Sequence, residues 1–580
     1  MARLDPHSYN DDTQPEVASL AWRATIDFTT RTLSAEARLR FAAPAEGPLD
    51  LDTRDLTIER VDGAEGPIAY SLQAPEPIFG ARLRVELPAG TREVRITYRT
   101  SPTASALQWL TPAQTAGGRE PFLFSQCQAI HARSLVPLQD TPRIRIRYTA
   151  ELEVPAQLRG LMAAAFRGRA VAGNLAVEKW EMPQPIPPYL FALAVGNLAS
   201  RELGPRSSVW AEPEVVERAA WEFAGVDDML RTAEGLFGPY DWERFDLLCM
   251  PPSFPYGGME NPRLTFLTPT LLAGDRSQVS VVAHELAHSW TGNLVSNASA
   301  EHFWLNEGFT VFAERRIVEA LDGPEVCALH ASLGRRDLDE ALERFAGQPA
   351  LTRLRTPLAG IDPDEAFSEV PYEKGYLFLR TIEEAVGRDA FSRFLRRYVE
   401  KFRFSAITTD DFLALCEAEL PGALARVDAP AWIDGPGVPP GAPRLRSSRL
   451  EALEQIGDRA PTDEEGARFT PVEWQLYLER LTRPSALCTE LDERFQLNAS
   501  GNYEVLVAWL GLALASDYAP ALPRVEQVLG QVGRMKYLKP LYRALAGKPA
   551  LREVAKRVFL SHRDGYHPIA QQVIEGMLSS

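Results

Sequence analysis

The chain has 580 residues, of which 45% are hydrophobic and 24% are charged, the proportions of an ordinary folded protein with roughly three to five domains. A mainly disordered, collagen-like or coiled-coil chain is therefore excluded. The 62 basic residues against 78 acidic residues give a formal net charge of −16, which disfavours binding to nucleic acid or to an anionic membrane.

The cysteines and the apolar runs bear on where the protein acts. Five cysteines lie far apart without a Cys-x-x-Cys pair, which favours a reducing cytoplasm over a disulfide framework. Acidic residues stand near the start, where an export signal needs an apolar core. The longest apolar run, Val505 to Ala515, is shorter than the ~18 residues that suggest a membrane span. We expect a cytoplasmic monomer with neither nucleic-acid nor membrane partners.

Residues 1–200 are predicted to form an antiparallel β-sheet domain with one face exposed to water. The run from Leu83 to Leu87 alternates apolar and polar side chains, as does the run from Val94 to Tyr98, and Pro88-Ala89-Gly90 lies between them. This pattern predicts a hairpin. The alternation returns between Ile144 and Val154, which extends the predicted sheet.

Beyond residue 200 the spacing of apolar residues becomes helical. We expect a mainly helical second domain over 201–433, with helical segments at 212–237, 278–295, 304–321 and 373–386. The Pro- and Gly-rich run within 434–446 predicts a linker. Residues 447–580 are predicted to be all-helical, and Thr470-Pro471-Val472-Glu473 has the N-cap, first-turn proline and acid of a capping box.

Two histidines form the strongest chemical signal. In His284-Glu285-Leu286-Ala287-His288 the imidazoles stand four residues apart, so on a helix both can reach one metal ion. Only 8 of 580 residues are histidine, so the pairing is unexpected by chance. Glu307 can supply a third ligand and leave a fourth position open. We predict one Zn²⁺ per chain on His284, His288 and Glu307, with Glu285 as the general base for water.

Two further patterns lie near this motif. Glu314 would share a helix face with Glu307 and could hold one imidazole, although a solvated or salt-bridged acid is an equally compatible interpretation. The segment Tyr256-Gly257-Gly258-Met259-Glu260 combines glycines, which let a ligand approach the backbone, with an acid that can pair with a substrate's amino group. In isolation this segment would be a glycine-rich turn.

Gly-Gly-Met-Glu-Asn at 257–261, followed by His-Glu-x-x-His and the distant Glu307, resembles the gluzincin aminopeptidases of peptidase family M1. The segments 124–131, 252–261, 370–375 and 533–536 resemble its leukotriene A-4 hydrolase and aminopeptidase B branch. The resemblance covers nearly the whole chain. It implies an α+β multidomain fold with an N-terminal β saddle, a thermolysin-like mixed α/β catalytic domain and a C-terminal all-α superhelical domain.

The resemblance also implies roles for individual residues. Gln128 and Glu260 would recognise the amino terminus of the substrate, together with the Tyr256–Met259 segment. Tyr372 would donate a hydrogen bond to the developing oxyanion. Arg534 and Lys536 would meet the C-terminal carboxylate of a peptide, which would favour short peptides. Without the resemblance, Tyr372 would be interpreted as a packed aromatic residue and the two cations as a solvated basic turn.

One position departs from the family pattern. Phe367 stands where leukotriene A-4 hydrolases carry a second tyrosine near the zinc, whereas Asp364 matches the acid that directs water in epoxide opening. We therefore expect a zinc aminopeptidase that acts on short peptides. The alternatives are a bifunctional aminopeptidase and epoxide hydrolase, and a peptide-binding or scaffold protein that has lost its metal.

Overall fold

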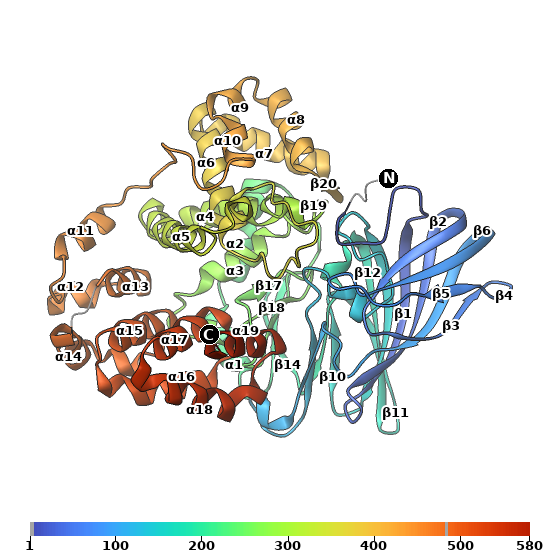
Figure 1. The fold of residues 1–580 in the computed structure, drawn as a ribbon, viewed down its shortest axis with the longest axis horizontal. Helices are drawn as coiled ribbons and strands as arrows, with labels where there is room; N and C mark the ends of the chain where they lie inside the picture. The colour runs from blue at the N-terminus through green and yellow to red at the C-terminus, as the bar shows by residue number, and fades with distance from the viewer. Residues whose placement is uncertain (1–4, 482–484, 580) are drawn as a thin grey trace.

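The structure, a computed structural model, describes residues 5–481 and 485–579. Figure 1 shows the N-terminal sheets in blue and cyan on one side of the molecule and the C-terminal helices in orange and red on the other. The helices of the middle of the chain, in green and yellow, lie between and above them. The expected α+β architecture is confirmed.

A nine-stranded sheet dominates the N-terminal part, in the order β11-β12-β9-β1-β2-β6-β3-β4 with β5 paired to β6. Its strands are β1 (Val17–Asp27), β2 (Thr32–Thr53), β3 (Thr57–Gly63), β4 (Gly66–Pro67), β5 (Tyr70–Leu72), β6 (Ala81–Arg99), β9 (Ile146–Pro155), β11 (Ala165–Ala172) and β12 (Leu175–Ile186). Buried residues alternate with more exposed ones along β9, as predicted for a sheet with one wet face. The expectation of wholly antiparallel pairing is wrong, because β1 and β9 run parallel. Their long separation in the chain leaves room for the crossover that parallel strands require.

The predicted hairpin around Pro88-Ala89-Gly90 is also wrong. Both apolar runs belong to the single strand β6, which pairs with the long strand β2 on either side of these residues. The register shifts near Ala45 and Gly47 of β2, opposite the Pro88–Gly90 segment, and Gly90 has a φ of +83°. An irregularity in the pairing therefore accommodates the proline and the left-handed glycine, so the strand bends there and continues.

Three smaller sheets connect this domain to the centre of the molecule. The first of these sheets has the strand order β10-β13-β8-β7. It consists of β7 (Leu107–Leu110), β8 (Phe122–Ser125), β10 (Arg159–Met162) and β13 (Leu193–Gly196). The second sheet has the strand order β14-β15-β16-β18-β17. It consists of β14 (Ala199–Gly204), β15 (Ser207–Ala211), β16 (Leu247–Cys249), β17 (Gly258–Met259) and β18 (Thr265–Leu267). Strands β19 (Val295–Asn297) and β20 (Ser405–Ile407) form a parallel pair. Gln128 follows β8 of the first small sheet, and Glu260 follows β17 of the second. Each of these two sheets therefore positions one of the predicted site residues.

The middle of the chain is mainly helical, as predicted. It contains α1 (Val216–Glu222), α2 (Val226–Phe237), α3 (Val279–Ala287), α4 (Trp304–Asp322), α5 (Pro324–Arg344), the π-helical turn η7 (Val370–Lys374), α6 (Gly375–Val386), α7 (Arg388–Phe402), α8 (Thr409–Glu419), α9 (Ala423–Arg426) and α10 (Ala429–Ile433). The segment predicted at 278–295 ends earlier than expected, with His288 as the C-cap of α3. A turn follows in which Gly292 has a φ of +119°, a conformation that cannot continue a helix.

The C-terminal part is all-helical. It contains α11 (Ser448–Ile456), α12 (Asp463–Arg468), α13 (Pro471–Arg480), α14 (Ser485–Phe495), α15 (Tyr503–Ala515), α16 (Leu522–Gln531), α17 (Met535–Ala546), α18 (Arg552–His562) and α19 (Pro568–Ser579). The predicted capping box is confirmed, since Thr470 and Glu473 exchange side-chain to backbone hydrogen bonds at the start of α13. No helix in the described ranges is long and apolar enough to span a membrane. The domain limits at 200, 433 and 446 stay predictions.

Two glycines allow α4 and α6 to touch. A Cβ atom placed on Gly375 would lie 2.7 Å from the Cα atom of Gly308, a backbone atom that cannot move aside. Beside this contact, Arg315 of α4 pairs with Glu373 of η7 at 2.6 Å, both buried. The close approach therefore fixes η7, and with it Tyr372, against α4.

Replacing Gly375 with Ala should lower the free energy of unfolding by about 1–3 kcal/mol, because the added methyl group would force α6 away from α4. Chemical denaturation followed by tryptophan fluorescence measures this loss. The matched control is Gly511→Ala in α15, where a Cβ atom meets nothing within 4 Å and the gain in helix propensity should stabilise slightly. Equal stability of the two variants would contradict the proposed constraint.

Candidate active site

Three metal-ligand side chains converge where α3 meets α4. His284 lies in α3, His288 caps its end, and Glu307 lies in the first turn of α4. The Oε2 atom of Glu307 is 3.4 Å from Nε2 of His284 and 3.5 Å from Nε2 of His288. These donor atoms all lie within 4.8 Å of one another, so the structure brings the predicted ligand set together.

The hydrogen bonds around the imidazoles orient both Nε2 atoms toward Glu307. Nδ1 of His288 is 3.1 Å from the carbonyl oxygen of Thr291, which can only accept, so the proton sits on Nδ1. Nδ1 of His284 is 3.0 Å from Oε2 of Glu314, and it donates to that carboxylate. Both Nε2 atoms thus face Oε2 of Glu307, a buried oxygen without a hydrogen-bond partner. Two imidazole nitrogens and a carboxylate oxygen that converge in this way are a ligand set that zinc prefers, so these residues fit a zinc ion.

Glu314 therefore acts on His284, as one of the two interpretations predicted. The neighbouring arginines are engaged elsewhere, Arg315 with Glu373 and Arg316 with Glu319. Burial alone would raise the pKa of Glu314, but the hydrogen bond and the charge of His284 outweigh burial and lower it. Glu314 is thus held as a carboxylate that accepts from the imidazole.

Glu285 lies beside the ligand set and not within it. It is buried, and a Cβ atom on Gly258 would collide with its carboxylate, so the glycine at this point of β17 makes room for the acid. Burial raises the pKa of Glu285 well above its ordinary value, against the opposing charge of His284, and Glu260 raises it further. A bound cation would act in the opposite direction.

Glu260 and Gln128 meet from two different sheets. Nε2 of Gln128 donates to Oε1 of Glu260 at 3.3 Å, and oxygen or nitrogen donor atoms of Glu260, Glu285 and His288 also cluster within 4.8 Å. Burial raises the pKa of Glu260. Met259 faces the other way, into the core, where its sulfur accepts a hydrogen bond from Gln126 at 3.1 Å. Met259 thus supports the strand, and Glu260 presents the charge.

Tyr372 lies beside the ligand set. Its ring stacks on that of His284 at 6.1 Å and meets that of Phe367 edge-on at 5.9 Å. Burial raises the pKa of Tyr372 well above its ordinary value, and the charge of Glu307 adds to the shift. The hydroxyl group is therefore protonated at neutral pH and can donate. Phe367 offers only an aromatic edge at this point.

Arg534 and Lys536 reach the same cavity from the C-terminal domain. Both pair with Glu504, at 3.4 Å from Nη1 of Arg534 and 2.8 Å from Nζ of Lys536. Nε of Arg534 is buried without a hydrogen-bond partner. A Cβ atom on Gly257 would lie 2.9 Å from Nη2 of Arg534, so this glycine lets the guanidinium lie against the 257–260 segment.

Asp364 is held by residues that are remote in the sequence. Its Oδ2 atom is 2.8 Å from Nε2 of His131, and Nδ1 of His131 is 2.8 Å from the hydroxyl of Ser105. Burial alone would raise the pKa of Asp364, but the hydrogen bond and charge of His131 lower it overall. Burial lowers the pKa of His567, which lies nearby, to about 3, so this histidine is neutral.

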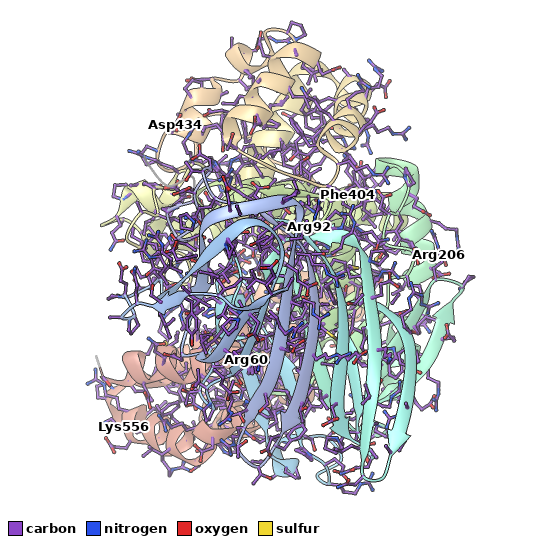
Figure 2. All side chains as sticks on the ribbon, turned by 90° about the vertical axis from the view of Figure 1, so that its right-hand side faces the viewer. Arg60, Arg92, Arg206, Phe404, Asp434 and Lys556 are labelled. Atoms are coloured by element: carbon purple, nitrogen blue, oxygen red, sulfur yellow. The ribbon has the colours of Figure 1, made fainter. Side chains whose placement is uncertain are left out.

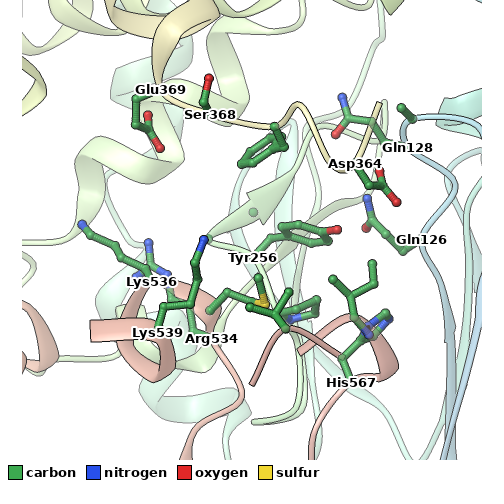
Figure 3. A pocket seen from close by; sticks show the side chains of 18 of the residues that line it. Gln126, Gln128, Tyr256, Asp364, Ser368, Glu369, Arg534, Lys536, Lys539 and His567 are labelled. Atoms are coloured by element: carbon green, nitrogen blue, oxygen red, sulfur yellow. The ribbon is translucent and has the colours of Figure 1, made fainter. Parts of the chain in front are cut away.

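One cavity of about 2700 Å³ joins these groups, and Figure 3 shows part of its lining. Of the predicted residues, Met259 is absent from the lining because it faces the core. The sequence analysis missed lining residues Gln126, Glu369, Lys539 and His567. Lys539 stands one helical turn after Lys536, a spacing that could have revealed it. Glu369 and His567 carry no comparable local signal.

Known proteins match the chain along most of its length. Family models match at residues 5–190 (Peptidase M1 N-terminal domain), 221–428 (Peptidase family M1 domain) and 469–578 (Leukotriene A4 hydrolase, C-terminal). The leukotriene A-4 hydrolase of Xenopus laevis is 38% identical over 599 residues, covering 98% of each chain. Leucine aminopeptidase 2 of Emericella nidulans is 38% identical over 556 residues, covering 90% of this chain and 89% of that one.

A solved structure supports the same relationship. Yeast LTA4 hydrolase in complex with bestatin superposes with a TM-score of 0.92 at 33% sequence identity. The match covers 99% of this chain and 97% of the other. The likeness therefore extends through all three parts of the chain and is not limited to the part that holds the histidines.

Removing the Glu314 carboxylate should weaken zinc binding without removing a ligand. Because His284 loses the group that orients its ring, the dissociation constant for zinc should rise about 10- to 100-fold in Glu314→Ala. Competition with a chromogenic chelator measures it. The control is Glu319→Ala, an acid of the same helix that pairs with Arg316 and Arg388. Equal zinc affinity in the two variants would show that Glu314 does not support zinc binding.

Proposed function

Because the chain belongs to peptidase family M1, in its leukotriene A-4 hydrolase branch, and is a zinc metallo-aminopeptidase, we propose that it removes the N-terminal residue from short peptides with the residues described above. The observation that carries this proposal is the convergence of His284, His288 and Glu307 in a cavity that is also lined by the acids Glu260 and Glu285 and by the cations Arg534 and Lys536. A peptide zwitterion has the complementary charge pattern.

His284, His288 and Glu307 would hold the zinc ion. When bound, zinc polarises a carbonyl group and lowers the pKa of a water molecule to about 7. Glu285, which is buried beside the ligands, accepts the proton of the attacking water and delivers it to the leaving amine. This general acid-base role accounts for roughly 10²- to 10⁴-fold of the rate.

Glu260 and Gln128 bind the amino terminus of the substrate. The carboxylate of Glu260 pairs with the ammonium group, and the carbonyl oxygen of Gln128 is free to accept from it because its amide nitrogen donates to Glu260. These groups lie next to Glu285, so the ammonium group and the scissile bond are separated by a single residue. Aminopeptidase activity follows from this short separation.

Tyr372 stabilises the oxyanion of the tetrahedral intermediate. Its hydroxyl keeps its proton because burial and the Glu307 charge raise its pKa, so it donates a hydrogen bond without becoming a second anion. A donor aimed at developing charge contributes roughly 10²- to 10³-fold to the rate.

Arg534 and Lys536 bind the C-terminal carboxylate of the peptide. They share a single carboxylate, Glu504, so the cluster keeps a net positive charge. Their fixed place in the cavity favours peptides whose carboxylate reaches them, which selects for short substrates. Cytoplasmic action as a monomer is also part of this proposal, supported by five buried, unpaired cysteines. The net charge of −16 supports the absence of a nucleic-acid partner.

Replacing Glu285 with Gln should lower kcat by about 10²- to 10⁴-fold and leave zinc content near one ion per chain. The reason is that the amide cannot accept the proton of water, whereas the three ligands are intact. A panel of aminoacyl chromogenic substrates measures turnover, and elemental analysis measures zinc. The same panel, run with chelator and then with added zinc, should show loss and recovery in the wild-type enzyme.

The control is Glu340→Gln on α5, which lines the cavity but has a side chain 69% exposed. It should turn over the panel at the wild-type rate. Near-normal turnover by the Glu285 variant, or wild-type activity that survives complete zinc removal, would overturn the proposed mechanism.

Epoxide hydrolysis is the second candidate function, and the position of Asp364 favours it. His131 holds this acid as a carboxylate in the same cavity, where it could direct water to an epoxide carbon. Phe367 lacks the hydroxyl group of the family tyrosine, so the aminopeptidase activity is better supported.

If epoxide hydrolysis occurs, a fatty-acid epoxide incubated with the enzyme should give diol faster than in buffer. Asp364→Asn should then reduce diol formation at least about tenfold, within the range typical of acid-base catalysis. Product analysis by mass spectrometry measures it, with the neighbouring Glu365→Gln as control. Diol formation at the buffer rate by the wild-type enzyme would restrict the protein to peptide hydrolysis.

A further inference from the structure

A second group of cations lines the cavity beyond Arg534 and Lys536. Helix α17 carries Lys536, Lys539 and Arg543 at positions i, i+3 and i+7, which places them along one helix face. All three line the cavity, as does Arg344 at the end of α5. Figure 3 shows Lys539 extending into the cavity beside Arg534 and Lys536.

The two cationic groups differ in their partners. Arg534 and Lys536 are both tied to Glu504. Within the described parts of the chain, by contrast, no carboxylate lies within 4.0 Å of the charged groups of Lys539, Arg543 or Arg344. The guanidinium of Arg344 donates to the carbonyl oxygen of Phe367 at 2.6 Å, which fixes its direction without neutralising its charge.

The surrounding charges show that these cations act on one another. Burial lowers the pKa of Lys539, and the charges of Arg344 and Arg543 lower it further. The charge of Glu369 opposes this shift. Two other acids of the same wall, Asp337 and Glu340, lie within 4.0 Å of Arg336. The cluster is therefore a set of mutually repelling cations without a contacting anion.

We propose that Lys539, Arg543 and Arg344 form a second carboxylate-binding subsite for the downstream part of the peptide. The inference rests on the proposed function, because it assumes that the cavity binds peptides with their carboxyl ends toward α17. Along the helix axis, Lys539 and Arg543 lie roughly 4.5 and 10 Å beyond Lys536, which corresponds to about one to three residues of an extended peptide.

Two substrate groups supply the required carboxylate. One is an aspartate or glutamate side chain in the third or fourth residue of the peptide. The other is the C-terminal carboxylate of a tetrapeptide or pentapeptide, which extends past Arg534 and Lys536. Either group would relieve the repulsion within the cluster, so the enzyme should prefer acidic or slightly longer peptides over neutral ones that end earlier.

Matched peptide pairs test the subsite. In one set, the third or fourth residue is Asp or Asn in an otherwise neutral peptide. In the other, tetrapeptides and pentapeptides end in a carboxylate or an amide. In at least one set, the kcat/KM of the wild-type enzyme should be about fivefold or more higher for the carboxylate peptide than for its amide partner. Added salt should reduce this carboxylate-to-amide ratio.

Lys539→Met, Arg543→Gln and the double variant identify the groups responsible. Met keeps the apolar stem of the half-buried lysine, and Arg543 is exposed, so the second change carries little risk to folding. The double variant should bring the carboxylate-to-amide ratio close to one in the set that responds. The control is Lys556→Met on the outer surface of α18 (Figure 2), where the lysine pairs with Glu553 and should leave the ratio unchanged.

The outcomes separate this inference from the proposed function. A ratio near one in both sets, or a ratio that survives in the double variant, overturns the subsite while peptide hydrolysis stands. Failure of the wild-type enzyme to hydrolyse any peptide of either set overturns the proposed function instead. The set whose ratio falls in the double variant shows whether a side chain or a chain end occupies the subsite.

Discussion

The centre of the structure depends on the convergence of three side chains on one point. Two imidazole nitrogens and a buried carboxylate oxygen face one another at 3.4–3.5 Å, and the carboxylate oxygen has no hydrogen-bond partner. Such a cluster persists only where its surroundings prevent each side chain from turning away. Glu314 and the carbonyl oxygen of Thr291 hold the two rings, and the packing of α3 on α4 holds Glu307. The contact of Gly308 with Gly375 then holds Tyr372 beside the same cluster, where its ring stacks on that of His284.

Acidic and basic groups of the cavity come from different parts of the chain, and under the proposed function this separation would give a bound peptide its direction. Glu260, Glu285 and Glu307 gather where α3 meets β17, whereas Arg534, Lys536 and Lys539 line the wall formed by the C-terminal domain. Under the proposed function, a zwitterionic peptide would be attracted more strongly in one orientation than in the other, and electrostatics would favour placing its amino end near Glu285. The net charge of −16 does not describe this site, because the local pattern contains both signs.

The sequence predicted the parts of the site that depend on local spacing. His284 and His288 are one helical turn apart, and the capping box of Thr470 and Glu473 is a four-residue pattern. Local spacing could not reveal contacts between remote segments, such as the contact of Asp364 with His131. Nor could it reveal the burial that raises the pKa of Glu369 to about 7. The prediction of a hairpin was wrong for a related reason. Pro88-Ala89-Gly90 has the local signature of a turn, but the long partner strand β2 keeps β6 extended through it.

The segment from residue 252 to 260 links the two groups that are proposed to recognise the ends of a peptide. At its far end lies Glu260, the proposed partner of the amino terminus. At its near end, the carbonyl oxygens of Pro252 and Pro255 accept hydrogen bonds from the amides of Gly533 at 2.7 Å and Met535 at 2.9 Å, on either side of Arg534. Arg534, the proposed cation for the carboxyl terminus, is thus attached to the same stretch of backbone that carries Glu260, the proposed anion for the amino terminus. Because covalent geometry and two backbone hydrogen bonds set the distance between them, the C-terminal domain would contribute to substrate length under the proposed function.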